Sequence, residues 1–407
     1  MVRKPDTAAG LSWVTAAPHR LFFFLGIVHL VFASAWWTYV VAARAFAWPQ
    51  PQESVPLFVH AAAMIYGFLP FFMFGFLFTA GPLWLKAEPL PARALAPAAW
   101  SATAGSFGIV VASWLSPEVS GMSALVFAAA WGVLLARFFG VIRRSPVADR
   151  LHAKLILVFM LIGLAGLVSY SGLMLSGRSE LHTVTVGLGL WGFALPVFLT
   201  VMHRMLPFFT SSALPFVVPW RPNWVLSCLL AGVLAHGALE LAGLGRFTWL
   251  ADAPSAAWVL WLSIRWGLLQ SLKIRLLAML HLGFAWLGIG YLLFAADALL
   301  RAADAGGLGY APLHALTMGF AGSLLFAMAT RVSVGHSGGT LVADDATWRL
   351  FLACQAAVLL RLAADALPAY QSYLMVGAAL AWLSVFTVWT QRYLPLYLRP
   401  RADGHPG

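Results

Sequence analysis

Residues 21–41 read LFFFLGIVHLVFASAWWTYVV. This run contains no Asp, Glu, Lys or Arg, and about 20 such residues are enough for a helix to cross the hydrocarbon core of a bilayer. A cleaved signal peptide would show a shorter apolar core followed by a small-residue cleavage site. The run therefore predicts a first membrane-spanning helix that stays attached to the chain.

Further apolar windows of similar length follow along the whole chain. The eighth window is short and is interrupted by Arg265, so it predicts a span less strongly than the others. Together the windows predict an all-α, polytopic transmembrane helix bundle of about 12 helices. In order, they fall near 20–44, 56–81, 95–116, 121–140, 152–175, 182–206, 222–243, 254–270, 274–299, 310–331, 347–367 and 370–394.

The composition supports the same fold class. Of the 407 residues, 61% are hydrophobic and only 10% are charged, whereas a soluble domain carries roughly a quarter charged residues. No linker or change of composition divides the chain, and no internal repeat of the kind found in transporters is evident. The sequence therefore predicts one integral-membrane domain, 1–407, with short cytoplasmic tails at 1–19 and 395–407.

The formal net charge of +11 comes from basic residues in short runs between the apolar windows. Cytoplasmic loops of membrane proteins are rich in Lys and Arg, and twelve spans would place every basic-rich segment on one side. This pattern predicts cytoplasmic termini and an inner-membrane location, with membrane lipid as the surrounding partner. Nucleic acid is excluded as a partner, because the basic residues form no patch beside a soluble fold. The basic-rich set contains Lys86, Arg93, Arg143, Arg144, Arg150, Lys154, Arg204, Arg221, Lys273, Arg275, Arg331 and Arg349, with Arg3, Lys4, Arg20, Arg392, Arg399 and Arg401 near the termini.

The two cysteines, Cys228 and Cys354, both fall in apolar windows. A free thiol in such surroundings behaves as a small hydrophobic side chain. Neither a disulfide framework nor a thiolate metal site is indicated, because the chain has no CxxC motif and no Cys/His cluster.

Seven of the eleven histidines lie within or at the edges of apolar windows: His29, His60, His182, His203, His236, His281 and His314. Ionisable side chains are costly inside a bilayer and so indicate function by default, and neutral imidazole is the side chain most used to bind haem iron or copper. The alternative for each is a histidine that is hydrogen-bonded to a neighbouring helix. The twelve-span topology places His60, His182, His236 and His314 towards the outer side, and His203, His281 and His336 towards the inner side.

Two of these histidines are followed four residues later by a methionine, His60 by Met64 and His314 by Met318. This spacing puts both side chains on one face of a helix, and imidazole with thioether suits haem iron or Cu(I). Chance pairs of this kind are also expected in a chain with 12 methionines.

Two arginines stand near the inner ends of apolar windows, Arg204 before Pro207 and Arg331 before a glycine-rich turn. Either could hold a haem propionate or another anion by bidentate pairing, or could be an ordinary inner-side arginine. From the residues alone, His60, His281, His314 and His336 are predicted as ligands of haem or metal.

Four blocks of sequence resemble the NnrS family of haem- and copper-containing membrane proteins. They are Arg204 with PFFT at 207–210, LHLGFAWL at 280–287, LHALTMG at 313–319, and Arg331 with GHSG at 335–338. The blocks occur in the family's order, and the resemblance extends over nearly the whole chain. It implies haem and copper as cofactors, with His60, His281, His314, Arg204 and Arg331 at the cofactors and His60, His281, His314 and His336 as metal ligands.

The chain departs from the family at the second window. The family usually has a Trp-His-x-His-Glu-Met run there, whereas this chain reads VHAAAM at 59–64, so that Ala62 and Ala63 replace the second histidine and the glutamate. His203 also stands where the family more often has glycine. Both differences point to a divergent member.

The resemblance implies a haem- and copper-binding protein of the nitric oxide response, acting in denitrification or in protection from nitrosative stress. Two other classes stay open at this stage. One is a polytopic transporter with the same helix count, and the other is a non-catalytic partner that helps to insert haem or metal into another enzyme.

Overall fold

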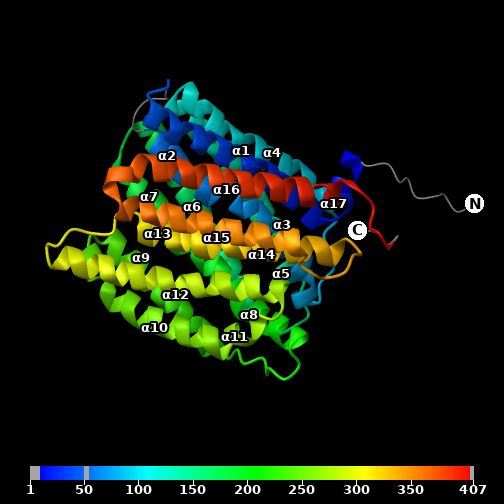
Figure 1. Cartoon of the computed structure of the whole chain (residues 1–407). Coiled ribbons are helices and arrows are strands. Elements are labelled where there is room, and N and C mark those ends of the chain that lie inside the picture. The colour runs from blue at the N-terminus through cyan, green and yellow to red at the C-terminus, as the bar shows by residue number, and fades with distance from the viewer. Residues whose placement is uncertain (1–9, 50–54, 404–407) are drawn as a thin grey trace, which may run out of the picture.

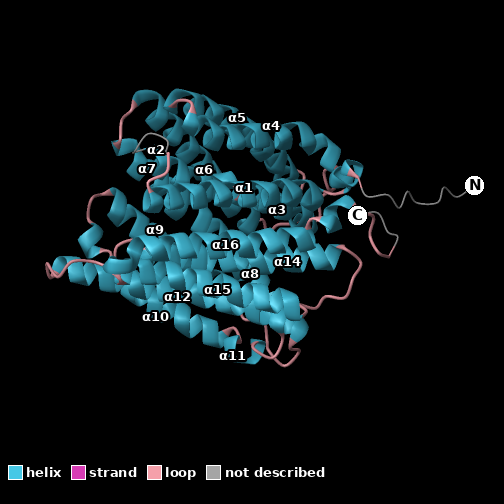
Figure 2. Cartoon of the chain, turned by 45° about the horizontal axis from the view of Figure 1, so that its top comes forward, coloured by secondary structure: helices cyan, strands magenta, loops and turns pink. Residues whose placement is uncertain are grey.

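The structure is a computed structural model that describes residues 10–49 and 55–403. Throughout these two ranges every regular element is a helix, and the long helices run side by side as one bundle (Figures 1 and 2). The predicted all-α fold is therefore confirmed. Arg3, Lys4 and the closing residues 404–407 lie outside the described residues.

Within the described ranges, eleven helical rods are long and apolar enough to cross a membrane. The first five are α1 (Pro18–Phe46), α2 with α3 (Val55–Ala62 and Leu69–Leu85), α4 (Ala92–Val111), α5 (Pro117–Arg143) and α6 (Leu151–Ser176). The other six are α7 with α8 (Glu180–Gly189 and Leu195–Ala213), α9 (Asn223–Leu241), α12 (Arg275–Ala302), α13 with α14 (Ala311–His314 and Ser323–His336), α15 (Asp345–Ala366), and α16 with α17 (Gln371–Tyr393 and Pro395–Leu398).

The eighth predicted span differs from the expectation. It forms α10 (Trp249–Arg265), which lies alongside α12 but has only 17 residues, or about 26 Å of helix. The helix ends there because Gly267 adopts a left-handed conformation (φ 104°), which commonly stops a helix. The prediction of about twelve helices is thus confirmed, with eleven rods in the described ranges that meet the length and composition of a span and α10 as a shorter twelfth rod.

Both described ends of the chain lie at one end of the bundle (Figure 1). The backbone N–H of Gly10 donates to the carbonyl of Leu398 at 2.9 Å, and Nη1 of Arg20 donates to the carbonyl of Arg399 at 2.7 Å. We call this end the terminal end and the opposite end the distal end. The shared position of the termini agrees with an even number of rods, whereas their cytoplasmic side stays a prediction.

The start of α15 at the terminal end is fixed by a capping aspartate. The side chain of Asp344 accepts a hydrogen bond of 3.0 Å from the backbone N–H of Thr347 and also pairs with Arg392. The Thr347 N–H, followed by the arginine, holds the pKa of the Asp344 carboxyl below its usual range. A charged cap is therefore retained at neutral pH.

Asp344→Ala should lower the free energy of unfolding by about 1 kcal/mol, because the first turn of α15 loses its cap. Since the folded state depresses the pKa of this carboxyl, its stabilising contribution is complete at neutral pH and is lost as the pH falls through that pKa. Thermal unfolding in detergent measures both effects. Asp344→Asn is the control, because an amide oxygen still caps a helix.

Candidate functional site

The structure divides the six predicted site residues between the two ends of the bundle. His60 on α2 and His314 on α13 lie at the distal end, near the first residue of each span. His281, Arg204 and Arg331 lie towards the terminal end. His336 ends the rod that His314 begins, so the two histidines are about 30 Å apart along it. They cannot bind the same ion.

His60 is held against an aromatic side chain that the sequence did not single out. Its half-buried imidazole stacks on Trp37 of α1, with ring centroids 3.6 Å apart and an angle of 16° between the planes. Among the described residues, its buried Nδ1 has no hydrogen-bond partner. The ring is therefore fixed by packing, while its nitrogens stay available.

The imidazole of His314 is oriented by the backbone. Its Nδ1 lies 2.9 Å from the carbonyl oxygen of Tyr310, and since a carbonyl only accepts, Nδ1 must carry the proton. In the neutral ring Nε2 is then an unprotonated donor atom for a metal. A histidine that bonds a carbonyl through one nitrogen and a metal through the other is the usual arrangement in metal sites.

The two distal histidines lie close enough to interact electrostatically with each other. Arg361 interacts with both rings, and Arg44 interacts with His60. The guanidinium of Arg361 is nearly buried and is held by Asp365 at 2.8 Å. Two imidazoles beside two arginines form a group that can bind a metal centre with anionic substituents. We call His60, His314, Arg44 and Arg361 the distal histidine site.

A π-helical segment follows each histidine of this site. Residues Ala63–Gly67 form one such segment after His60, and Ala315–Gly322 form another after His314. Met64 and Met318 lie within them. π-helical turns are rare and frequently mark functional sites, yet nothing in the amino-acid pattern signalled them. Each histidine–methionine pair of the distal histidine site therefore has its methionine in a π-helical segment.

The predicted residues near the terminal end each have a separate partner. Nε2 of His281 lies 2.9 Å from Oγ1 of Thr210. The rings of His336 and His19 have their centroids 4.4 Å apart. The guanidinium of Arg331 covers Phe209 at 4.0 Å, and that of Arg204 covers Trp84 at 4.8 Å. These contacts show aromatic and hydroxyl partners, so the roles of these four residues in binding haem or metal stay predictions.

His203, which stands where the family more often has glycine, has a structural partner that the sequence did not reveal. Nε2 of His203 donates to the carbonyl of Pro222 at 3.2 Å, and its Nδ1 accepts from Nε2 of His152 at 3.0 Å. The pair ties α6 to α8 and to the loop that precedes α9.

A haem iron fits the distal histidine site by the chemistry of its side chains. The site offers an oriented imidazole with a free Nε2, a second imidazole with a free nitrogen, and two cationic groups suited to propionates. For copper, no group of three His, Cys, Asp or Glu side chains that could hold a metal ion is found in the described part of the chain. Imidazole and thioether are the side chains here that suit Cu(I).

The profile of the family described as NnrS protein matches residues 13–401, which includes every span and all four sequence blocks. No match was found among curated proteins.

Proposed function

The chain belongs to the NnrS family, and from that premise we propose that it is a haem-binding membrane protein that acts on or responds to nitric oxide. The observation that carries this proposal is the tautomer of His314, whose Nδ1–H bonds to the Tyr310 carbonyl and so leaves Nε2 free beside His60. A bound haem would supply an iron that binds nitric oxide and exchanges one electron.

The side chains of the distal histidine site have distinct tasks in this proposal. His314 and His60 would hold the iron. Arg361, kept in place by Asp365, and Arg44 would pair with the propionates. Trp37 covers one face of the His60 ring and so keeps water from that side. Copper is proposed on the family resemblance alone, with His281 and His336 as further candidate ligands, and no step depends on it.

We also propose that the terminal end faces the cytoplasm of a cell whose inner membrane holds this protein. The multi-pass helical architecture is shown by the structure. The loops that join α3 to α4, α5 to α6 and α8 to α9 lie at the terminal end and carry Lys86, Arg144, Arg150 and Arg221. This distribution agrees with the rule that basic loops remain cytoplasmic.

The test of the proposed function is the absorption spectrum of the purified protein from cells supplied with haem and copper. We expect a Soret band that shifts when nitric oxide is added, and haem that stays with the protein through purification. A colourless protein would overturn the proposal. Substrate uptake by protein-loaded vesicles that persists after substitution of His60, His281 and His314 would instead favour a transporter, and transfer of bound haem to another enzyme would favour an assembly partner.

A further inference from the structure

Outside the distal histidine site, His236 forms a buried ion-pair contact inside the bundle. Nδ1 of His236 on α9 lies 2.7 Å from Oδ1 of Asp252 on α10, and neither side chain is exposed. Buried ionisable pairs in membrane segments are costly and mark proton or ion sites in many transporters and pumps. The predicted eighth span, 254–270, does not include Asp252, so the pair was not predicted from the sequence.

The ring of His236 is fixed from both sides. Trp191, in the π-helical segment Leu190–Ala194, stacks on it with centroids 3.8 Å apart, and Phe294 of α12 meets it edge-on at 4.5 Å. Gly237 makes this approach possible, because a β-carbon there would lie 2.4 Å from Cβ of Trp191. The imidazole therefore cannot rotate freely, and its second nitrogen points in a set direction.

Three polar atoms of this cluster are unpaired. Across residues 10–49 and 55–403, Nε2 of His236, Oδ2 of Asp252 and the hydroxyl of Tyr291 are all buried without a hydrogen-bond partner. Tyr291 of α12 lies close enough to Asp252 to interact with its charge. Buried polar atoms in folded proteins are almost always paired. A base oriented by a carboxylate, with its other nitrogen free, is an arrangement suited to accepting a proton.

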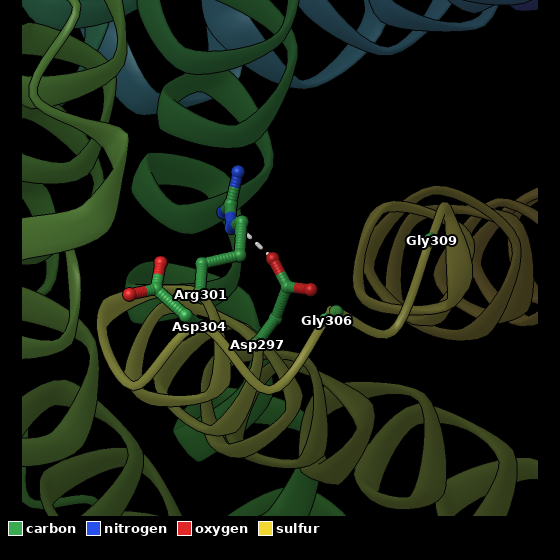
Figure 3. Close-up of a pocket in the computed structure, with 6 residues that line it drawn as sticks. Asp297, Arg301, Asp304, Gly306 and Gly309 are labelled. Carbon is green, nitrogen blue, oxygen red and sulfur yellow. Dashed lines mark ion pairs between the residues drawn. The ribbon is translucent and has the colours of Figure 1, made fainter.

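Charged residues lead from this cluster to the distal surface. Glu240 lies one turn beyond His236 on α9. The carboxylate of Glu240 and the guanidinium of Arg301 both lie near Gly245, since a β-carbon built on that glycine would be 3.1 Å from Oε1 of Glu240 and 3.8 Å from Nη1 of Arg301. Arg301 in turn pairs with Asp297 at 2.6 Å (Figure 3). Along α12, Asp297 and Arg301 are four residues apart and lie on one face of the helix, whereas Tyr291 lies further from the distal end and on a neighbouring face.

The surface end of this route is a pocket of about 600 Å³, lined by Asp297, Arg301, Asp304, Gly306, Gly307 and Gly309. The loop that forms it is held by Asp297, whose Oδ1 accepts from the backbone N–H of Leu308 at 2.6 Å. Because Asp297 is paired with Arg301 and with the Leu308 N–H, Asp304 is the carboxylate of this pocket that can attract protons and cations from the aqueous phase.

We propose that His236 and Asp252 form a proton-binding pair that is loaded from the distal surface through this pocket and Glu240. In the loading step a hydronium ion gives a proton to Nε2 of His236, so that one O–H bond breaks, one N–H bond forms and water is released. The imidazolium then balances the Asp252 carboxylate, and the pair changes from a net charge of −1 to neutral. Neutralising a buried charge is favourable.

Charged and titratable groups surround His236 on several elements. Its own helix contributes Glu240, α10 contributes Asp252, α12 contributes Tyr291, and the short helix Gly245–Phe247, which packs on α9, contributes Arg246, with Asp297 and Arg301 further out. The π-helical segment that carries Trp191 contains no titratable residue. The titratable residues of the two other helices packed on α9 lie near their ends: Glu180 and His182 in the first turn of α7, and His203 and Arg204 towards the terminal end of α8.

The pair can be tested by ¹⁵N NMR of the whole protein in lipid, with only histidine labelled. We expect the His236 signal, which is identified by its absence from His236→Gln, to show a protonated Nδ1 and an Nε2 that becomes protonated as the distal-side pH is lowered. Asp252→Asn keeps a similar shape but removes the charge. In this variant, Nε2 of His236 should no longer become protonated over the pH range in which it does so in the wild-type protein. A wild-type His236 signal that does not respond to pH, and that is the same in Asp252→Asn, would show the pair to be purely structural and would overturn the proposal.

The route is tested by infrared detection of proton uptake after a rapid change of pH. Glu240→Gln leaves the pair intact and should slow uptake by about a hundredfold, as expected when a positioned acid–base group is lost. The matched control is Glu118→Gln, which changes another acid at the distal end, in the first turn of α5, and should leave uptake unchanged. Uptake at the wild-type rate in Glu240→Gln would overturn the route. Both measurements can be made whether or not haem is bound, so their failure is distinct from failure of the proposed function.

Discussion

His314→Ala should yield a folded protein that is purified with little or no haem. The Nε2 of this imidazole is the best-defined ligand atom of the distal histidine site, because the Tyr310 carbonyl fixes both its tautomer and its direction. Alanine removes the ligand without adding bulk next to the π-helical segment. The Soret absorbance relative to protein, and haem extracted from the same sample, measure the loss.

Two further variants make this result specific. His60→Ala should also lose haem or change its spectrum to that of an iron with one fewer imidazole, and added free imidazole should restore part of the signal in either variant. His203→Gly is the matched control, since His203 lies towards the terminal end, where it bonds His152 and Pro222, and glycine is the residue expected there from the family resemblance. Haem content equal to wild type in both His314→Ala and His60→Ala would contradict the proposed site.

The spans could be predicted from the sequence because lipid imposes a length and an apolar composition on each of them. Eleven of the twelve windows match a rod that meets both requirements. The eighth window, 254–270, differs in its bounds from α10. It was placed on the apolar residues after Pro254, whereas α10 begins at Trp249 and includes Asp252. A buried partner, His236, makes that acid compatible with the helix, and a pattern of single residues does not contain such a pairing.

The candidate site could be predicted only in part, because its residues come from separate spans. His60 and His314 were identified by type and depth. Arg44 and Arg361 lie outside the basic-rich set, and the packing of α1 on α2 and of α15 on α13 brings them to the histidines. The π-helical segments follow from tertiary packing too, since neither AMIYG nor ALTMGFAG differs in composition from an ordinary membrane helix.

The departure from the family at Ala62 and Ala63 has a clear structural setting. Both alanines are fully buried, with exposures of 0% and 1%, and Ala63 begins the π-helical segment. Longer side chains at these positions would therefore point into the protein and not into lipid. The family's second histidine and glutamate would add ligands or proton carriers at this depth, and this chain keeps only His60 there. Its chemistry should accordingly depend more strongly on the single His60–His314 pair.

Gly166→Ala should destabilise the protein by about 2–3 kcal/mol and lower its haem content as well. A β-carbon at Gly166 of α6 would lie 2.1 Å from the hydroxyl of Tyr66, which is buried and donates to the carbonyl of Thr185 at 2.6 Å. The tyrosine must then move or lose its hydrogen bond. Because Tyr66 belongs to the π-helical segment that follows His60, its displacement should also disturb the distal histidine site.

A double-mutant cycle separates this contact from a general effect of glycine replacement. Tyr66→Phe removes the hydroxyl, after which the nearest ring atom to the new β-carbon, Cζ, would be 3.1 Å away. The double variant should therefore be more stable than the sum of the two single effects predicts. Gly172→Ala on the same helix is the control, because its β-carbon would meet only Leu181 at an ordinary 3.4 Å. Equal destabilisation by Gly166→Ala and Gly172→Ala, with no coupling to Tyr66, would show that close packing of α6 on Tyr66 does not hold this part of the bundle together. Unfolding in detergent and the Soret absorbance of the same samples give the two readouts.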